Sequence, residues 1–238
     1  SAWTFARAAR SGELARLFAA PAPAEAAGEP ADTADAAGAA APPPVAHYLL
    51  AVNFYNQLAL QPAEREFERR LALELAEAVA RECHGQVQCL PGVGVLVDFH
   101  HRKDAERPFQ VICAALLLAR LLRDEAPFGS YRLGMNLALH PAGATLPVDD
   151  AAVGDATLLS ALAPDDTLAI SATVARALEN ETRYAAKRLD NPLLDELATS
   201  NGHCYLVIGV APPFDTLIGQ QAERIKAQRD AISSPSTF

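Results

Sequence analysis

The pattern of apolar and polar positions predicts alternating strands and helices from residue 45 onward. His47 to Phe54 is a mostly apolar run of strand length, typical of an interior strand covered on both faces. A helix is predicted to begin at Pro62, because proline suits the first helical position. Apolar residues then recur every four positions, at Phe67, Leu71, Leu75, Val79 and Cys83. This spacing indicates an amphipathic helix lying on a sheet.

Two short alternating runs surround a tight turn between residues 85 and 99. The turn is Pro91-Gly92-Val93-Gly94, and the apolar positions beside it are Val87, Cys89, Val95, Val97 and Phe99. Alternation on both sides of a glycine-rich turn predicts a β-hairpin.

A second helix and a fourth strand follow the hairpin. Asp104 is predicted to cap a helix that has Pro108 in its first turn and runs to about Glu125. Tyr131 to His140 then alternates, with Leu133, Met135, Leu137 and Leu139 facing one way. The order strand, helix, strand, strand, helix, strand predicts an α/β (α+β) fold with a ferredoxin-like βαββαβ core and helices covering the sheet.

Further elements are predicted beyond this core. They are a helix at 155–162, a strand at 167–170, a Ser171-capped helix to Leu178 and a strand at 204–210.

The predicted domain, residues 45–212, lies between segments of different character. Residues 1–20 form an amphipathic pattern, expected to be a helix that ends a missing upstream part. Residues 21–44 contain 11 Ala and 6 Pro and nothing apolar larger than Ala, so we expect a flexible, disordered linker. Residues 213–238 are expected to be a C-terminal tail.

Composition limits the possible partners. The net charge of −9 and the lack of a basic patch argue against nucleic acid or an anionic membrane surface. The most apolar run, Ile112 to Leu122, contains Arg120 and is too short to span a bilayer, so no membrane contact by this fragment is expected. Four cysteines without a CxxC pair favour free thiols in a reducing compartment. We therefore expect a cytoplasmic location, which includes the cytoplasmic portion of an inner-membrane protein.

Several of these segments together resemble the class III nucleotidyl cyclase homology domain. They are Asn53-Phe54-Tyr55-Asn56, the hairpin at 85–99, Arg132-Leu133-Gly134, Val153-Gly154-Asp155 and Leu168-Ala169-Ile170-Ser171. Their order and spacing follow the family over about residues 45–210. The resemblance therefore implies the cyclase version of the ferredoxin-like fold.

The same resemblance implies that the catalytic set is degenerate. In the family, two carboxylates hold two cations, and these positions fall on Asn53 and Val93. The lysine that reads adenine falls on Cys89, and the asparagine and arginine that serve ribose and the transition state fall on Leu158 and Leu162. We therefore expect no metal, no cofactor and no catalysis.

The function expected from this comparison is a catalytically inactive regulatory, dimerisation or partner-binding module of a membrane or signalling protein. It would act as a homodimer or with a partner protein. An apolar former substrate face would be covered by a second chain, or by the chain's own segment from Phe214 to Ile225. The alternative is a sensor that binds a nucleotide or cyclic nucleotide without turnover. Its expected contacts are Asn53, Asn56, Gly92, Gly94 and Asp149. An active atypical cyclase is the least favoured interpretation.

Two polar groups have competing interpretations. Asn53, Asn56 and Gln57 could line a remnant pocket, but turn chemistry accounts for them more simply. His100 and His101 could bind a metal, but adjacent residues at a strand end point in opposite directions. The sequence therefore favours a solvated loop at the two histidines.

Overall fold

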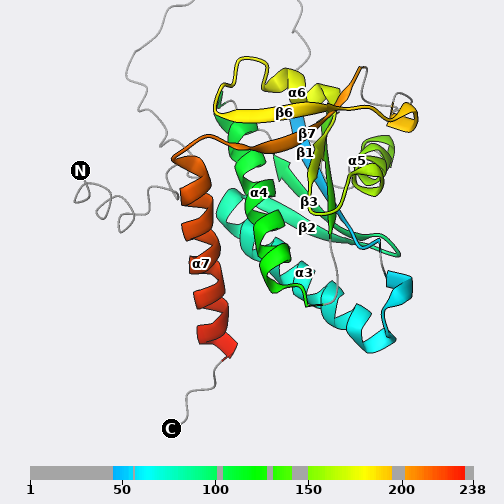
Figure 1. Cartoon of the computed structure of the whole chain (residues 1–238), viewed down its shortest axis with the longest axis vertical. Helices are drawn as coiled ribbons and strands as arrows, with labels where there is room; N and C mark the ends of the chain where they lie inside the picture. The colour runs from blue at the N-terminus through cyan, green and yellow to red at the C-terminus, as the bar shows by residue number, and fades with distance from the viewer. Residues whose placement is uncertain are drawn as a thin grey trace, which may run out of the picture.

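A seven-stranded sheet runs through the part of the chain that the computed structural model describes, with strand order β2-β3-β1-β4-β5-β7-β6 (Figure 1). The described residues are 45–55, 57–100, 104–127, 131–140, 150–194 and 202–233. The strands are β1 (Val45–Asn53), β2 (Gly85–Leu90), β3 (Gly94–His100), β4 (Arg132–His140), β5 (Leu168–Ile170), β6 (Tyr184–Leu189) and β7 (Cys204–Val210). The helices are α3 (Pro62–Cys83), α4 (Arg107–Glu125), α5 (Asp150–Leu162), α6 (Ala172–Ala177) and α7 (Phe214–Ser233), with short 3₁₀ turns η1 (Gln57–Ala59) and η2 (Pro192–Leu194).

The first half of the sheet has the predicted ferredoxin-like arrangement. Strand β1 pairs antiparallel with both β3 and β4, and β2 pairs antiparallel with β3. Helices α3 and α4 connect these strands in the order βαββαβ. Strand β5 then adds parallel to β4, and β7 and β6 extend the sheet antiparallel. The predicted fold class is therefore confirmed.

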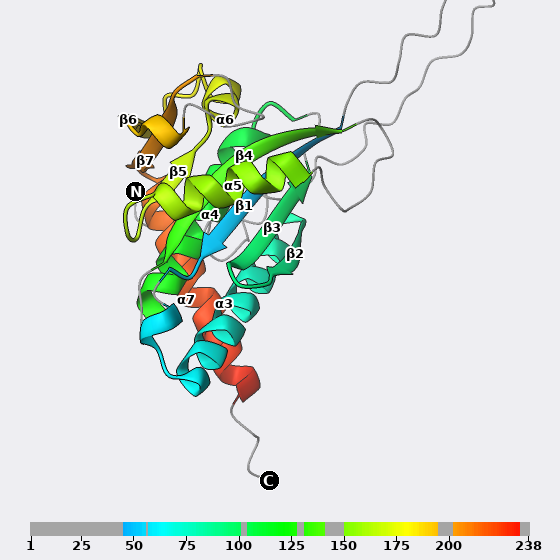
Figure 2. The same ribbon diagram turned by 90° about the vertical axis from the view of Figure 1, so that its right-hand side faces the viewer.

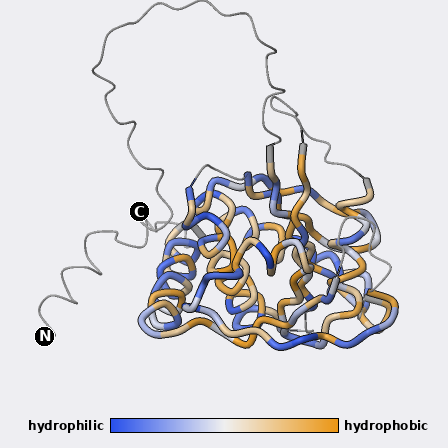
Figure 3. Tube along the Cα trace, turned by 90° about the horizontal axis from the view of Figure 1, so that it is seen from above, coloured by the Kyte–Doolittle hydropathy of each residue, from blue (hydrophilic) through white to orange (hydrophobic). Residues whose placement is uncertain are grey.

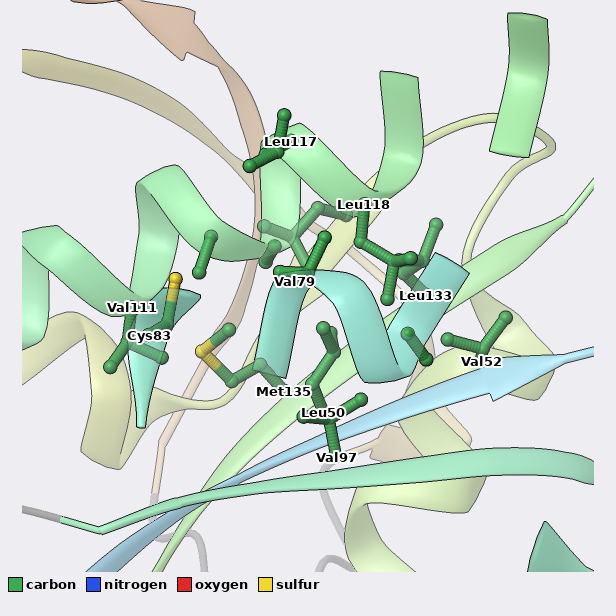
Figure 4. Close-up of a cluster of buried hydrophobic side chains, with 14 of the residues drawn as sticks. Leu50, Val52, Val79, Cys83, Val97, Val111, Leu117, Leu118, Leu133 and Met135 are labelled. Atoms are coloured by element: carbon green, nitrogen blue, oxygen red, sulfur yellow. The ribbon is translucent and has the colours of Figure 1, made fainter. Parts of the chain in front are cut away.

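Helices cover both faces of the sheet, with α3, α4 and α7 on one face and α5 on the other (Figures 1 and 2). Successive residues of β1 point to opposite faces. Leu50 and Val52 join the main core with α3 and α4, as Figure 4 shows, whereas Leu49 and Ala51 pack with Ala152 of α5. Strand β1 is apolar on both faces, as expected for a strand covered on both sides; Figure 3 colours the described residues by hydropathy.

Helix α7 packs on α4, and it does not cover the former substrate face, which was one of the two expected arrangements. Ile218, Ala222 and Ile225 belong to the main core cluster, on the α3 and α4 side of the sheet. The ring of Phe214 meets that of Phe109 edge to face, with centroids 4.9 Å apart. Lys226 Nζ donates to Asp124 Oδ2 of α4 at 2.8 Å. The option that this segment covers the former substrate face, where α5 carries Leu158 and Leu162, is therefore wrong, because its apolar stripe is buried on the α3 and α4 side.

One strand was missed by the sequence analysis, and one predicted helix cap is wrong. Strand β6 was not predicted, because its exposed Ala-Lys-Arg centre has no apolar alternation and it forms by pairing with β7. Asp104 is not the residue before helix α4, which starts at Arg107 after Glu106. The Asp104 carboxylate accepts instead from the Glu106 backbone N–H at 2.9 Å and so orders the turn that leads into the helix.

The cysteines are free, as the sequence indicated. Cys83, Cys113 and Cys204 are buried and Cys89 is exposed. Burial raises the pKa of the Cys83 and Cys113 thiols to about 12. Both thiols therefore act as small apolar core groups.

None of the described helices combines the length and the apolar character needed to cross a bilayer. The expected N-terminal helix and the Ala/Pro linker lie outside the described residues.

Candidate functional site

The end of β1 and the turn between β2 and β3 form one corner of the sheet. Asn53 is paired with Gly94 in the β1–β3 register. One residue further, the Phe54 backbone N–H donates to the Val93 carbonyl oxygen at 3.0 Å. The two positions that the resemblance assigns to metal-binding carboxylates, 53 and 93, are therefore brought together as the hairpin prediction requires.

Glycines give this corner its shape. Gly92 has φ +75°, a left-handed conformation that side chains disfavour. A Cβ atom added to Gly94 would lie 2.0 Å from the Val52 carbonyl oxygen, so only glycine allows β3 to approach β1 here. The turn therefore depends on the glycines at positions 92 and 94.

The side chains at the corner carry little charge. Asn53 and Val93 are half-buried, one an amide and the other aliphatic. Among the described residues, no group of three His, Cys, Asp or Glu ligand atoms gathers at this corner. An amide oxygen contributes no net charge, and hard divalent cations bind mainly to carboxylates.

The guanidinium group of Arg132, next to Asn53, is held by several partners. Arg132 lies opposite Asn53 in the β1–β4 register, and its guanidinium stacks 4.0 Å from the Tyr55 ring centroid. Its Nε donates to Asp165 Oδ1 at 2.9 Å and its Nη1 donates to the Ala161 carbonyl at 3.0 Å. Hydrogen bonds from Tyr55 and Arg132 hold the pKa of Asp165 below its usual range. This network ties the end of α5 to the end of β1.

Gly134 lets α5 lie directly on β4. A Cβ atom at this position would be 2.2 Å from the Ser160 backbone nitrogen and 2.7 Å from the Ala156 carbonyl oxygen. The Arg-x-Gly resemblance thus corresponds to two physical roles, an anchoring arginine and a contact that admits no side chain.

The other predicted site residues are divided between the two faces. Leu158 and Leu162 of α5 are half-buried and pack against the cluster formed with β5 and β7. Cys89 is paired with Val95, whose side chain belongs to the α3 side, and Arg69 Nη1 of α3 lies 3.7 Å from its sulfur. Cys89 therefore points to the face opposite Asn53. Asn56 and Asp149, predicted as ligand contacts, lie outside the described residues.

Sequence reasoning missed two buried polar residues on the α5 face. His47 is 1% exposed and Asp98 is fully buried, and they form a pair across β1 and β3. The available signal was an acidic residue inside Gly94 to His100, a strand whose other interior members are apolar. A buried acid in such a strand needs a partner on a neighbouring element.

With this geometry established, the chain can be compared with known proteins. No protein-family model and no curated protein sequence matches it. Solved structures do match. The adenylyl cyclase CyaB from P. aeruginosa superposes with a TM-score of 0.56 at 12% identity, covering 71% of this chain and 96% of that one.

Two further structures agree with this result. The guanylate cyclase domain of RhGC from Catenaria anguillulae, in complex with GTP, has a TM-score of 0.54 at 13% identity over 72% of this chain and 100% of that one. A dimeric guanylyl cyclase domain of the RhoGC fusion protein from Blastocladiella emersonii has a TM-score of 0.53 at 13% identity, covering 72% and 99%. The fold of this chain is therefore that of the class III nucleotidyl cyclase catalytic domains, as the sequence resemblance implied.

Proposed function

We propose that this chain is a catalytically inactive nucleotidyl-cyclase-like domain that serves as a regulatory module, acting through self-association or a partner protein. The observation that carries the proposal is that Asn53 and Val93 lie together at the corner, at the two positions that the resemblance assigns to metal ligands. Two-metal phosphoryl chemistry needs anionic ligands to hold the cations. The amide of Asn53 and the isopropyl group of Val93 supply no anionic ligand.

The rest of the expected set supports the same proposal. Leu158 and Leu162 offer aliphatic carbon where the resemblance implies hydrogen-bond donors, and Cys89 faces the other side of the sheet. Loss of a single transition-state donor costs about 3 to 4 kcal/mol. Loss of several leaves no route to turnover.

We expect no magnesium- or manganese-dependent formation of cyclic AMP or cyclic GMP by the full chain. The double variant Asn53→Asp with Val93→Asp should bind Mn²⁺ more tightly, because it returns two charges to the corner. It should still form no product, because Leu158 and Leu162 remain. Product is measured by mass spectrometry and metal affinity by calorimetry. Asn53→Asp alone is the matched control for one added charge.

Chelator-sensitive cyclic nucleotide formed by the unmodified protein would overturn the proposal. A thermal-shift titration with ATP, GTP and their cyclic products, run on the same samples, separates a nucleotide sensor from a purely protein-binding module. Stabilisation by a nucleotide without turnover would redirect the proposal to the sensor.

The surface around the corner supports association. Leu58 is 95% exposed, and Phe67 and Tyr55 are also exposed; all three lie on or beside η1 and the start of α3. Exposed large apolar side chains on successive elements are candidates for a protein interaction surface. The RhoGC structure with the same fold is described as dimeric.

We expect light scattering to show a dimer of the full chain that weakens with dilution. Leu58→Asp with Phe67→Asp should shift it to monomer, because two carboxylates would be desolvated in the interface. Leu193→Asp is the control, since Leu193 is 58% exposed but lies on η2. A monomer at every concentration would direct the proposal to a partner protein. Dissociation by the control alone would place the interface elsewhere.

We also propose that the domain is cytoplasmic, as the regulatory part of a membrane or signalling protein. The support is chemical, because four cysteines that form no disulfide suit a reducing compartment.

A further inference from the structure

We propose that His47, Asp98 and His100 form a binding site for a divalent transition-metal cation of the Zn²⁺ type. The site is independent of the proposed function. It lies on the same face of the sheet as Asn53, but six residues away along β1, which is about 20 Å at the rise of a strand.

The strand register brings the three side chains together. His47 of β1 is directly opposite His100 of β3. Asp98 precedes His100 by two residues, so both point to the same face of the sheet. Directly opposed Cβ atoms in an antiparallel pair are about 4.5 to 5.5 Å apart. Two imidazoles and one carboxylate therefore converge without help from a flexible loop.

The distances fit a small cation after minor adjustment. His47 Nδ1 lies 3.0 Å from each Asp98 carboxylate oxygen, and His100 Nε2 lies 3.9 Å from Asp98 Oδ2. The histidine ring centroids are 4.5 Å apart, and one ligand atom from each residue lies within 4.8 Å of the other two. Tetrahedral zinc at bond lengths of 2.0 to 2.2 Å separates neighbouring ligand atoms by about 3.4 Å. The separation of 3.0 Å between His47 and Asp98 is shorter than this value, and that of 3.9 Å between His100 and Asp98 is longer. Small movements of the side chains would bring both to it.

Burial and ligand type indicate which cation. Asp98 is fully buried and His47 nearly so, whereas the His100 side chain is 40% exposed. A buried carboxylate requires a compensating positive charge. Imidazole nitrogen with one carboxylate suits zinc and its neighbours better than calcium or magnesium. An ion could enter beside His100, and three protein ligands leave a coordination position for water.

The end of β3 is held from outside the cluster. Arg107 Nε of α4 donates to the His100 carbonyl oxygen at 2.9 Å. This bond fixes the backbone that carries one ligand, as outer contacts do in established metal sites. The solvated loop favoured for His100 and His101 is therefore wrong for His100, which belongs to a cluster, while His101 lies outside the described residues.

The test uses untagged protein comprising residues 1–238, with Cys89→Ser in every sample to remove the exposed thiol. After dialysis against chelator, calorimetry with Zn²⁺ should give one ion per chain. His100→Ala should weaken binding by at least the roughly 10- to 100-fold that loss of an outer partner costs. His203→Ala, at an exposed histidine near β7, should leave the affinity unchanged. Circular dichroism checks that each variant is folded.

Cobalt absorption tests directly whether the residue at position 100 binds the metal. His100→Cys should retain Co²⁺ and add a near-ultraviolet thiolate-to-cobalt band that is absent without this substitution. The competing interpretation is a metal-free ion pair between His47 and Asp98. In that case no stoichiometric ion binds, and Asp98→Asn changes only the stability. That result, or equal zinc affinity in His100→Ala and the parent protein, would overturn the proposal.

Discussion

Replacing Gly134 by Ala should lower the free energy of unfolding by more than about 3 kcal/mol, the upper end of the usual cost of overpacking. The added methyl group would lie 2.2 Å from the Ser160 backbone nitrogen and 2.6 Å from Leu159 Cβ. Neither atom belongs to a flexible side-chain end, so α5 must move away from β4. At this size of domain the melting temperature should fall by about 6 to 12 °C. Denaturant unfolding followed by circular dichroism measures the change.

Gly154→Ala, in the helix α5 that packs on Gly134 of β4, is the matched control. A Cβ atom at Gly154 meets nothing within 4 Å, and the residue is exposed. Alanine should therefore stabilise the chain by about 0.5 to 1 kcal/mol through its helix propensity. Two glycine-to-alanine changes in one helix–strand unit would thus have opposite signs. A loss below 1 kcal/mol for Gly134→Ala would mean that α5 is not seated on β4 at this distance.

Replacing Arg107 by Ala should cost about 3 kcal/mol or more, because it removes two hydrogen bonds from a charged donor, each worth about 1.5 to 3 kcal/mol. Arg107 is 1% exposed. Its Nη2 donates to the Cys83 carbonyl at 3.0 Å, and its Nε donates to that of His100 at 2.9 Å. The Cys83 carbonyl is among the last of α3, which have no partner within the helix. One side chain therefore joins the ends of α3 and β3 to the start of α4.

Two comparisons make the Arg107 result specific. Arg107→Lys should retain part of the stability, because an ammonium carries the charge but lacks the planar fork that reaches two carbonyls. Arg81→Ala, at an exposed arginine in the last turn of α3, should change the free energy of unfolding by less than about 1 kcal/mol. Equal losses for Arg107→Ala and Arg81→Ala would show that the buried bonds contribute nothing specific.

These contacts explain how this fold persists without the acidic groups that the resemblance implies. The corner near Asn53 is shaped by Gly92, Gly94 and the backbone bond from Phe54 to Val93. The two layers are held by apolar packing and by the close approach at Gly134. None of these requires a carboxylate at position 53 or 93. Acidic residues can therefore be absent from the corner while the sheet and helices stay in place.

The sequence by itself determined the elements whose signal is local. The two-sided apolar run of β1, the four-residue spacing in α3 and the glycine turn at Gly92 to Gly94 each depend on nearby residues. Together they were sufficient for the order of strands and helices in the ferredoxin-like core. The resemblance added the cyclase topology, which local patterns alone do not contain.

Only the tertiary structure decided the features that depend on long-range register. Strand β6 has no apolar alternation and exists because β7 offers it an edge. Helix α7 has an apolar stripe that could cover either face, and its fit against α4 settled the choice. His47 and His100 are 53 positions apart in sequence and meet only because β1 and β3 pair in one register. A shift of one residue would turn one of the two histidines to the other face.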